Sequence, residues 1–155
     1  MTKQCDHTSV GMLVWRDEKL LLIERAKYPF GFAVPAGHVD ADQTFEAAAT
    51  RELKEEVGLD AQTLELIGEK RKENPCRREN GTWHYWKIYK VSAQGELRRS
   101  EDETKRAGWY TLEQVRQLGK RTDEYLEHRI SEDDWAKSPG LEPVMHEWLK
   151  ELNII

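Results

Sequence analysis

Apolar and polar positions in the first quarter of the chain predict two paired strands. From His7 to Glu24 an apolar run, the turn-like RDEK and a second apolar run follow one another, a pattern typical of a β-hairpin. The next stretch, up to Gln43, is rich in Pro and Gly and predicts a loop around a short extended piece at Phe32–Val34. Loops of this kind often carry functional residues.

The composition changes to Ala, Leu, Glu, Lys and Arg in the next segment, which predicts a helix from Thr44 to Val57. Asp42 or Thr44 is suited to cap its start, and Gly58 is placed to end it. Two strands are predicted after this helix, at residues 63–73 and 82–91, with a turn at Asn80-Gly81 between them. The second strand is rich in aromatic residues, so we expect it to lie near the centre of a sheet.

The last third of the chain is predicted to hold a polar loop at residues 92–108 and a strand end that leads into a short helix closed by Gly119. In the tail, apolar residues recur at helical spacing: Leu141, Val144, Met145, Trp148 and Leu149. We expect this stripe to pack on the core; a partner-binding helix is the alternative. Strands and helices that do not alternate strictly predict an α+β or mixed α/β sandwich.

Length and charge limit the classes of protein that fit. The chain has 155 residues and 38% hydrophobic content, which is enough for one domain with a core. A formal net charge of -5 argues against a general nucleic-acid coat protein, but not against a small anionic substrate. With neither an apolar leader nor a membrane-length apolar segment in the sequence, we expect a soluble protein of the cytoplasm that contacts no membrane.

The two cysteines, Cys5 and Cys76, are far apart in the sequence and belong to no CxxC motif or recognisable Cys/His quartet. Their spacing therefore predicts neither a disulfide framework nor a structural zinc site. A soft metal shared by Cys5 and His7 is a minor alternative.

Three glutamates, Glu52, Glu55 and Glu56, lie close together in the predicted helix. Successive helical residues are rotated by about 100°, so the three carboxylates share one face. Phe45 and Ala48 flank that face and favour partial burial, and half-buried charge needs a counter-charge. A divalent cation such as Mg²⁺ would supply it. A solvated surface helix has the same composition, and the residues alone leave both interpretations open.

The sequence around this helix resembles the signature of the Nudix hydrolase family. That signature is a Gly, five residues, a Glu, seven residues, and then Arg-Glu-aliphatic-any-Glu-Glu-any-Gly-aliphatic. Here it begins at Gly37, and every position of its second half, from Arg51 to Leu59, matches. The predicted strands on both sides extend the resemblance to residues 7–118.

One position departs from the signature, because Gln43 stands where the first Glu is expected. In the family this residue steadies the junction between loop and helix, often through the signature arginine, here Arg51. Glutamine can accept a hydrogen bond from that arginine, but the charge-assisted part of the contact is lost. We therefore expect a weaker contact, with the metal ligands retained.

The resemblance implies a Nudix-type α/β/α sandwich, with a mixed sheet between helices, in a single domain over residues 1–155. It implies an enzyme that cleaves a nucleoside diphosphate linked to a group X, most simply a nucleoside triphosphate or similar nucleotide. ADP-ribose or another sugar nucleotide is one alternative, and a non-catalytic domain that binds a nucleotide for regulation is another. Nucleic acid is not expected as a partner. A homodimer is compatible with the family.

The resemblance also implies a metal site and a general base. Glu52, Glu55 and Glu56 would hold Mg²⁺ or Mn²⁺, with a backbone carbonyl near Gly37 as a further ligand, which makes Glu55 and Glu56 catalytic. A general base must take a proton from the attacking water. Glu103, in the acidic loop at residues 101–103, is the expected base, and Glu56 is its rival.

Cations are expected to hold the phosphates. Arg25 and Lys27 follow the second predicted strand, where family members often carry phosphate-binding cations. An arginine can bind two phosphate oxygens at once, whereas a lysine acts as a point charge. Arg77 is a further candidate, next to Arg78 in the loop before the aromatic strand.

Aromatic residues beside these cations are candidates for stacking on a nucleobase. In a strand, Trp83 and Tyr85 point to one side while His84 and Trp86 point to the other. Only one pair can face a cleft, and the sequence does not decide which. Trp86 is our predicted substrate-binding residue from this strand.

Overall fold

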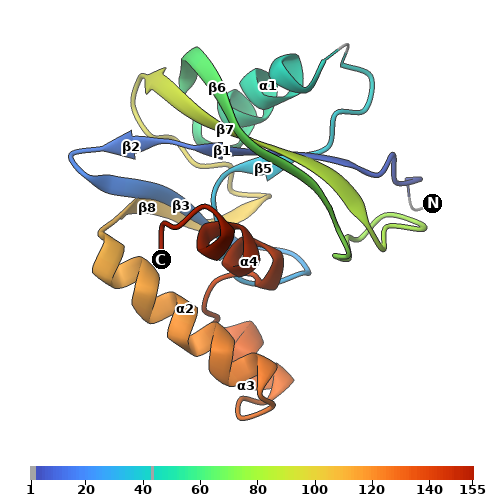
Figure 1. Ribbon diagram of the computed structural model, residues 1–155, viewed down its shortest axis with the longest axis vertical. Helices are drawn as coiled ribbons and strands as arrows, with labels where there is room; N and C mark the ends of the chain where they lie inside the picture. Colours follow the sequence, from blue (N-terminus) through green and yellow to red (C-terminus); the bar gives the residue numbers. More distant parts are fainter. Residues whose placement is uncertain (1–2, 43) are drawn as a thin grey trace.

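The computed structural model describes residues 3–42 and 44–155, and Figure 1 shows the arrangement of their strands and helices. The strands are β1 (Thr8–Leu13), β2 (Trp15–Arg16), β3 (Lys19–Arg25), β4 (Phe32–Ala33), β5 (Ala36–Gly37), β6 (Asp60–Lys72), β7 (His84–Gln94) and β8 (Thr104–Tyr110). The helices are α1 (Phe45–Val57), α2 (Leu112–Leu126), α3 (Glu132–Lys137) and α4 (Pro143–Glu151). Within the described ranges, each helix is too short or too polar to cross a membrane.

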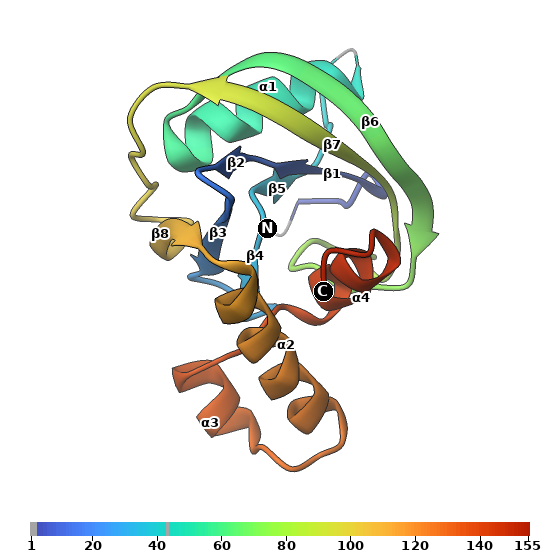
Figure 2. The ribbon, with the colours of Figure 1, turned by 60° about the vertical axis from the view of Figure 1, so that its left-hand side comes forward.

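Two four-stranded sheets form the centre of the fold. The first has the order β5-β1-β7-β6, in which β1 and β7 are parallel and the other neighbours are antiparallel. The second contains β2, β3 and β4 in that order, with β8 paired to β3, and is antiparallel throughout. Figure 2 shows the sheets between α1 on one side and α2 and α4 on the other. The predicted α+β fold with a mixed sheet between helices is confirmed.

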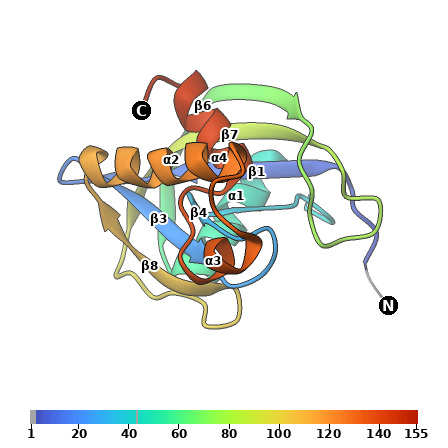
Figure 3. The same cartoon turned by 90° about the horizontal axis from the view of Figure 1, so that it is seen from below.

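Apolar side chains are buried on both sides of the sheets. Beneath α1, the core contains Val10, Met12, Leu21, Ile23 and Leu53, among others. Toward α2 and α4, it contains alternate residues of the same strands together with the helix residues, including Leu20, Leu22, Ile88, Val115, Leu141, Val144, Met145, Trp148 and Leu149. The stripe in the tail therefore packs on the core, as expected, and α4 lies beside α2 (Figure 3).

The predicted N-terminal hairpin is confirmed only next to its turn. Trp15 pairs with Leu20 and Arg16 pairs with Lys19. The preceding strand, β1, instead pairs with β5 and β7 in the other sheet. Almost every residue of β1 and β3 is buried, so neither strand has a polar face to specify its partners, and the apolar pattern alone could not identify them.

Helix α1 begins and ends where the sequence predicted. Thr44 is its N-cap, and the Thr44 hydroxyl accepts a hydrogen bond from the Ala47 N–H at 3.0 Å. Gly58 ends the helix with a φ of 77°, a left-handed conformation that favours glycine. The two predicted strands after the helix are β6 and β7, and β7 lies between β1 and β6, as its aromatic composition indicated.

Two boundaries predicted for the last third of the chain are wrong. Strand β8 begins at Thr104, inside the expected loop, because it pairs along β3. Helix α2 does not end at Gly119 but continues to Leu126. Gly119 is buried inside the helix, where the absence of a side chain lets α2 approach Ile155 and His146. The glycine therefore serves helix packing instead of helix termination.

This packing predicts the effect of replacing Gly119. A Cβ there would lie 3.3 Å from Ile155 Cδ1, a tight contact that a terminal side chain can relieve. Alanine favours the helix by about 1 kcal/mol over glycine, so we expect Gly119→Ala to raise the free energy of unfolding by about 0.5 kcal/mol. Gly140→Ala is the contrast: its Cβ would overlap the Leu118 carbonyl oxygen, and a loss of about 2 kcal/mol is expected. Urea denaturation measures both, and a less stable Gly119→Ala protein would contradict this account.

Candidate active site

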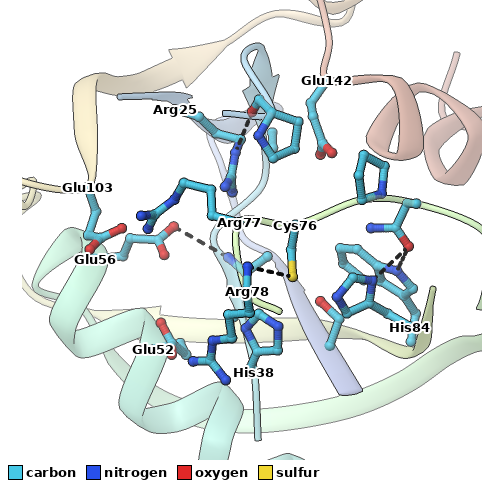
Figure 4. Close-up of a pocket in the computed structure, with 18 of the residues that line it drawn as sticks. Arg25, His38, Glu52, Glu56, Cys76, Arg77, Arg78, His84, Glu103 and Glu142 are labelled. Atoms are coloured by element: carbon cyan, nitrogen blue, oxygen red, sulfur yellow. Dashed lines mark hydrogen bonds between the residues drawn. The ribbon is translucent and has the colours of Figure 1, made fainter. Parts of the chain in front are cut away.

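Side chains from several elements line one cavity of about 730 Å³. Figure 4 shows glutamates of α1 at one side, the loop between β6 and β7 in the middle, and the start of α4 across from the glutamates. The cavity-lining residues predicted from the sequence are Arg25, Gly37, Glu52, Glu55, Glu56, Arg77, Trp86 and Glu103. The structure thus brings together candidates that are spread over 79 positions of the chain.

Two of the α1 carboxylates are withdrawn from water. Glu56 is only 8% exposed, and burial, reinforced by the neighbouring Glu52 charge, raises its pKa to about 8. Burial also raises the pKa of Glu52 to about 7, against the opposing effect of Arg51. The Glu55 carboxylate is 60% exposed and lies at the rim. Adjacent buried carboxyls with raised pKa values form a strong site for a cation.

The backbone of β5 lies directly against these carboxylates. A Cβ on Gly37 would overlap the Glu52 carboxylate, so the glycine is required by a close approach. The Ala36 N–H lies 3.4 Å from Glu56 Oε1. Carboxylate oxygens are ligands that hard divalent cations prefer, and the site therefore fits a divalent cation of this kind.

Arg51 holds the start of α1 to the preceding loop. Its Nε donates to Asp42 Oδ2 at 2.8 Å, and its Nη2 donates to the His38 carbonyl oxygen at 3.1 Å. Its Nη1 donates to Glu52 Oε1 at 2.9 Å and to Glu55 Oε2 at 3.1 Å. Arg51 therefore orients the acidic residues without lying between them and the cavity.

Arg51 has a charge-assisted contact to Asp42, which the sequence suggested only as a possible cap. The weaker contact predicted between Gln43 and Arg51 stays a prediction, because Gln43 lies outside the described residues. An acidic residue next to the departing position was the available signal in the sequence.

Arg25 and Glu142 both lie on the side of the cavity opposite Glu52 of α1 (Figure 4). Arg25 Nε donates to the Pro29 carbonyl oxygen at 2.7 Å, and its positive charge opposes the raised pKa of both Glu56 and Glu142. Glu142 is 5% exposed, and burial raises its pKa to about 7. Glu142 was not a candidate from the sequence, because it precedes a helix whose apolar stripe forms part of the core.

The remaining predicted cations have different surroundings. Arg77 and Arg78 both line the cavity, and Arg78 Nη2 also donates to Asp40 Oδ2 at 2.9 Å. Lys27 lies outside the cavity lining and is 44% exposed, with its Nζ 3.9 Å from Glu103 Oε1. The positive charge of Lys27 therefore acts on the cavity through the nearby Glu103 carboxylate.

The structure decides which side of the aromatic strand faces the cavity. His84 and Trp86 line it, while Trp83 stacks on His7 with ring centroids 4.2 Å apart. Trp86 is 4% exposed, and its indole N–H donates to Asn74 Oδ1 at 3.1 Å. Its stacking on a substrate stays a prediction, and its position is in the cavity wall.

A second, smaller pocket of about 140 Å³ adjoins the first. The two share Pro29, Asn74, Pro75 and Glu142 as lining residues. Aromatic side chains make up much of its wall: Tyr28, Phe30, Tyr125 and Trp135. None of these was a candidate from the sequence, because they come from segments far apart in the chain.

The expectation that the chain has no Cys/His quartet is wrong. Potential ligand atoms of Cys5, His38, Cys76 and His84 lie within 4.8 Å of one another. His7 is not among them, since its ring lies against Trp83. Ligands spread from residue 5 to residue 84 form no local motif, so spacing along the chain could not reveal them.

Comparisons with known proteins agree with this arrangement. A family model described as NUDIX domain matches residues 6–130. The ADP-ribose pyrophosphatase of Methanocaldococcus jannaschii is 42% identical over 62 residues, which are 39% of this chain and 37% of the relative. The NAD-capped RNA hydrolase NudC of Pseudomonas aeruginosa is 30% identical over 106 residues, which are 68% of this chain and 36% of the relative. The matches thus cover little more than a third of each relative.

A solved structure extends the comparison to three dimensions. The crystal structure of MutT NUDIX hydrolase from Burkholderia pseudomallei is 27% identical and superposes with a TM-score of 0.61. The superposition covers 69% of this chain and 84% of that chain.

The raised pKa of Glu56 predicts how stability changes with pH when metal is removed. A carboxyl with a folded-state pKa of about 8, against an ordinary 4.5, favours the folded state at low pH and loses that contribution as the pH rises to 8. The Glu56→Gln protein does not lose stability in this way, because glutamine carries no titrating carboxyl group. In a chelator we expect the variant to be more stable than wild type by at least about 1 kcal/mol at pH 8.5, with the difference shrinking toward pH 5.

Urea denaturation of both proteins at the two pH values measures the difference. Glu55→Gln is the matched control, because the Glu55 carboxylate is exposed and its charge therefore has little effect on stability. A Glu56→Gln protein less stable than wild type at pH 8.5 would show that the buried charge is already compensated.

Proposed function

Because the chain belongs to the NUDIX domain family, we propose that it is a metal-dependent pyrophosphohydrolase that cleaves a nucleoside diphosphate linked to a group X. One observation carries the proposal: the half-buried Glu52 and the buried Glu56 meet the backbone of β5 in a cavity that also holds Arg25 and Arg77. The carboxylates that would bind a metal ion thus lie in the same cavity as the arginines that would bind phosphate.

Glu52, Glu55 and Glu56 would hold Mg²⁺ or Mn²⁺, with main-chain oxygen near Gly37 as a further donor. The fit rests on the closeness of the half-buried Glu52 and the buried Glu56, whose raised pKa values show that their ionised forms lack compensation that a divalent ion would supply. When bound, the ion would offset the negative charge of phosphate oxygens and favour attack by water. Arg51 keeps the Glu52 and Glu55 carboxylates oriented for this task.

Arg25 and Arg77 are the residues proposed to bind the diphosphate. The Arg25 guanidinium is fixed through Nε by the Pro29 carbonyl, so its terminal nitrogens remain for phosphate oxygens in the fork geometry that arginine provides. Lys27, beside Glu103, would add positive charge at the rim. The substrate would be held with its phosphates between these cations and α1.

Glu103 is the proposed general base, with Glu56 as the rival. The Glu103 carboxylate lines the cavity and is 53% exposed, so water can reach it. It would accept a proton from the attacking water as the new P–O bond forms and the anhydride P–O bond breaks. In the metal-free protein Glu56 has a pKa of about 8, so it is protonated near neutral pH and is better suited to metal binding after it loses that proton.

The second pocket supports a nucleotide as the substrate. Its aromatic wall, with Tyr28 and Phe30 at 6.5 Å between ring centroids, can receive a base by stacking. Glu142 stands where the two pockets meet, and its carboxylate would repel phosphates and accept hydrogen bonds from sugar or base. We propose a nucleoside triphosphate or similar nucleotide, and ADP-ribose as the first alternative.

One prediction of this proposal concerns turnover. Nucleoside triphosphates, dinucleoside polyphosphates, ADP-ribose and other sugar nucleotides are incubated with Mg²⁺, Mn²⁺ or EDTA, and released phosphate, pyrophosphate and nucleoside monophosphate are quantified. We expect metal-dependent hydrolysis of at least one compound and a fall in kcat of about 10³-fold in Glu56→Gln, because a buried metal ligand is lost. Tight binding of a compound with no turnover under either metal would instead indicate a regulatory nucleotide-binding domain.

The second prediction separates Arg25 from Lys27. Arg25→Ala removes a fixed guanidinium inside the cavity, and kcat/KM should fall by about 10² to 10³-fold because charge-assisted contacts to phosphate are lost. Lys27→Ala removes an exposed charge outside the lining, and a change of about threefold or less is expected. Equal effects of the two substitutions would contradict the assigned position of the phosphates.

A further inference from the structure

We propose that Cys5, His38, Cys76 and His84 form a structural zinc site in the wall of the catalytic cavity. It is separate from the carboxylate site of α1 and differs from it in ligand chemistry. Thiolate and imidazole ligands select Zn²⁺, whereas carboxylates select Mg²⁺ or Mn²⁺. Four protein ligands would leave no open position, which is typical of a structural zinc.

The three distances from Cys5 Sγ to the other ligand atoms match a tetrahedron around zinc, and all four ligand atoms lie within 4.8 Å of one another. With Zn–S bonds of about 2.3 Å and Zn–N bonds of about 2.0–2.1 Å, tetrahedral angles require about 3.8 Å between two sulfurs and about 3.6 Å between sulfur and nitrogen. The Cys5 and Cys76 Sγ atoms are 3.8 Å apart. Cys5 Sγ lies 3.4 Å from His84 Nε2 and 3.7 Å from His38 Nε2.

The surroundings prepare these atoms to be ligands. His84 Nδ1 lies 3.2 Å from Asn74 Oδ1, which also accepts from the Trp86 indole at 3.1 Å. The amide oxygen thus accepts a hydrogen bond from Nδ1–H and leaves the Nε2 lone pair directed at Cys5 Sγ. A hydrogen bond from the second ring nitrogen is the usual support of a zinc-ligating histidine.

Backbone donors are directed at both sulfurs. The His7 N–H lies 3.3 Å from Cys5 Sγ, and the Arg78 N–H lies 3.4 Å from Cys76 Sγ. In each case the donor is two residues beyond the cysteine. Each N–H can donate to a metal-bound sulfur, and the thiolate is the form of cysteine that binds metal. A Cβ on Gly81 would overlap Cys76 Sγ, so the loop folds tightly around this sulfur.

A Cys5–Cys76 disulfide explains the cluster less well. A disulfide requires about 2.05 Å between sulfurs, far less than the observed 3.8 Å, and it would give no role to the two imidazoles. The His38 and His84 rings stand edge to face, with centroids 5.4 Å apart, so both nitrogens converge on the same sulfur. A common central atom accounts for all four convergent ligand atoms.

The site would join segments that shape the cavity. Cys5 belongs to the N-terminal segment, which the Cys5 N–H ties to the Glu79 carbonyl at 3.0 Å. His38 follows Gly37 of β5, and Cys76 precedes Arg77 in the loop between β6 and β7. Figure 4 shows His38 and Cys76 beside Arg78, within the same cavity as Glu52 and Glu56. Zinc would hold the metal-binding backbone and the phosphate-binding loop at a fixed separation.

The test uses the full chain, purified under reducing, oxygen-free conditions without added metal. We expect about one zinc per chain by elemental analysis. After removal of zinc by a chelator, titration with Co²⁺ should produce the visible bands of tetrahedral cobalt and the thiolate-to-cobalt absorption that carboxylate ligands cannot give. Chelation should lower the midpoint of thermal unfolding by at least about 5 °C, since the metal binds only the folded chain.

Variants distinguish this site from the carboxylate site. Cys76→Ser should lose the zinc and the thiolate-to-cobalt absorption, and its unfolding midpoint should no longer respond to the chelator. Glu56→Gln should keep all three properties. His7→Asn is the matched control, because His7 is adjacent in sequence, has a positive φ of 58° that Asn tolerates, and supplies no ligand. None of these measurements depends on turnover, so the proposed function can fail while this proposal holds.

If Cys76→Ser does not fold, the wild-type chain carries the test alone: bound Zn²⁺ or Co²⁺ should protect both thiols from alkylation. The proposal is overturned if the reduced wild type contains no zinc, gives no thiolate-to-cobalt absorption, and reacts with alkylating agent equally fast with and without Zn²⁺. A Cys5–Cys76 disulfide that persists under the same reducing conditions would also overturn it.

Discussion

Two carboxylates buried against the backbone of β5 are the constraint on which the rest of the site depends. Glu52 and Glu56 lie one helical turn apart, and the missing side chain of Gly37 lets the Glu52 carboxylate approach the main chain. Water is largely excluded from Glu56, so each negative charge raises the cost of the other. A fold that keeps such a pair must obtain compensation elsewhere, and Arg51, Arg25 and a divalent cation are the available sources.

The scaffold meets this cost by fixing α1 at both ends. Thr44 caps its start and Gly58 ends it, while apolar residues hold the helix against the sheets. Arg51 then connects the helix to the loop before it through Asp42 and the His38 carbonyl. The helix backbone that carries the carboxylates cannot move away from this loop without breaking core contacts and the arginine network.

Local signals in the sequence predicted the parts of the structure that depend on neighbouring residues. The extent of α1 and the central position of β7 follow from caps, spacing and composition over short distances, whereas Gly37 and the three α1 glutamates were chosen through the resemblance to the Nudix signature. The strand partners of β1 did not follow in this way, because a strand buried on both faces has no polar side to fix its pairing. The helix end predicted at Gly119 was wrong because a glycine can either end a helix or allow close packing inside it, and the residue type alone does not distinguish the two.

The site residues that sequence reasoning missed are the ones that only tertiary folding assembles. Glu142, the aromatic wall of the second pocket and the Cys/His quartet come from separate segments, and each looked like an ordinary core or loop residue in its own surroundings. Asp42 is the exception: it stands beside the position of the expected acid, and only the path of the loop shows that its carboxylate reaches Arg51.

The pairing between β4 and the segment before α4 determines when the cavity can be completed during synthesis of the chain. The Phe32 N–H donates to the Gly140 carbonyl at 2.8 Å, and the Glu142 N–H donates back to the Phe32 carbonyl at 2.9 Å. One wall of the cavity is thus built from residues translated more than a hundred positions after the strand that they join. These contacts can form only after residues 140–142 have been synthesised, so this wall of the cavity is completed late in the chain.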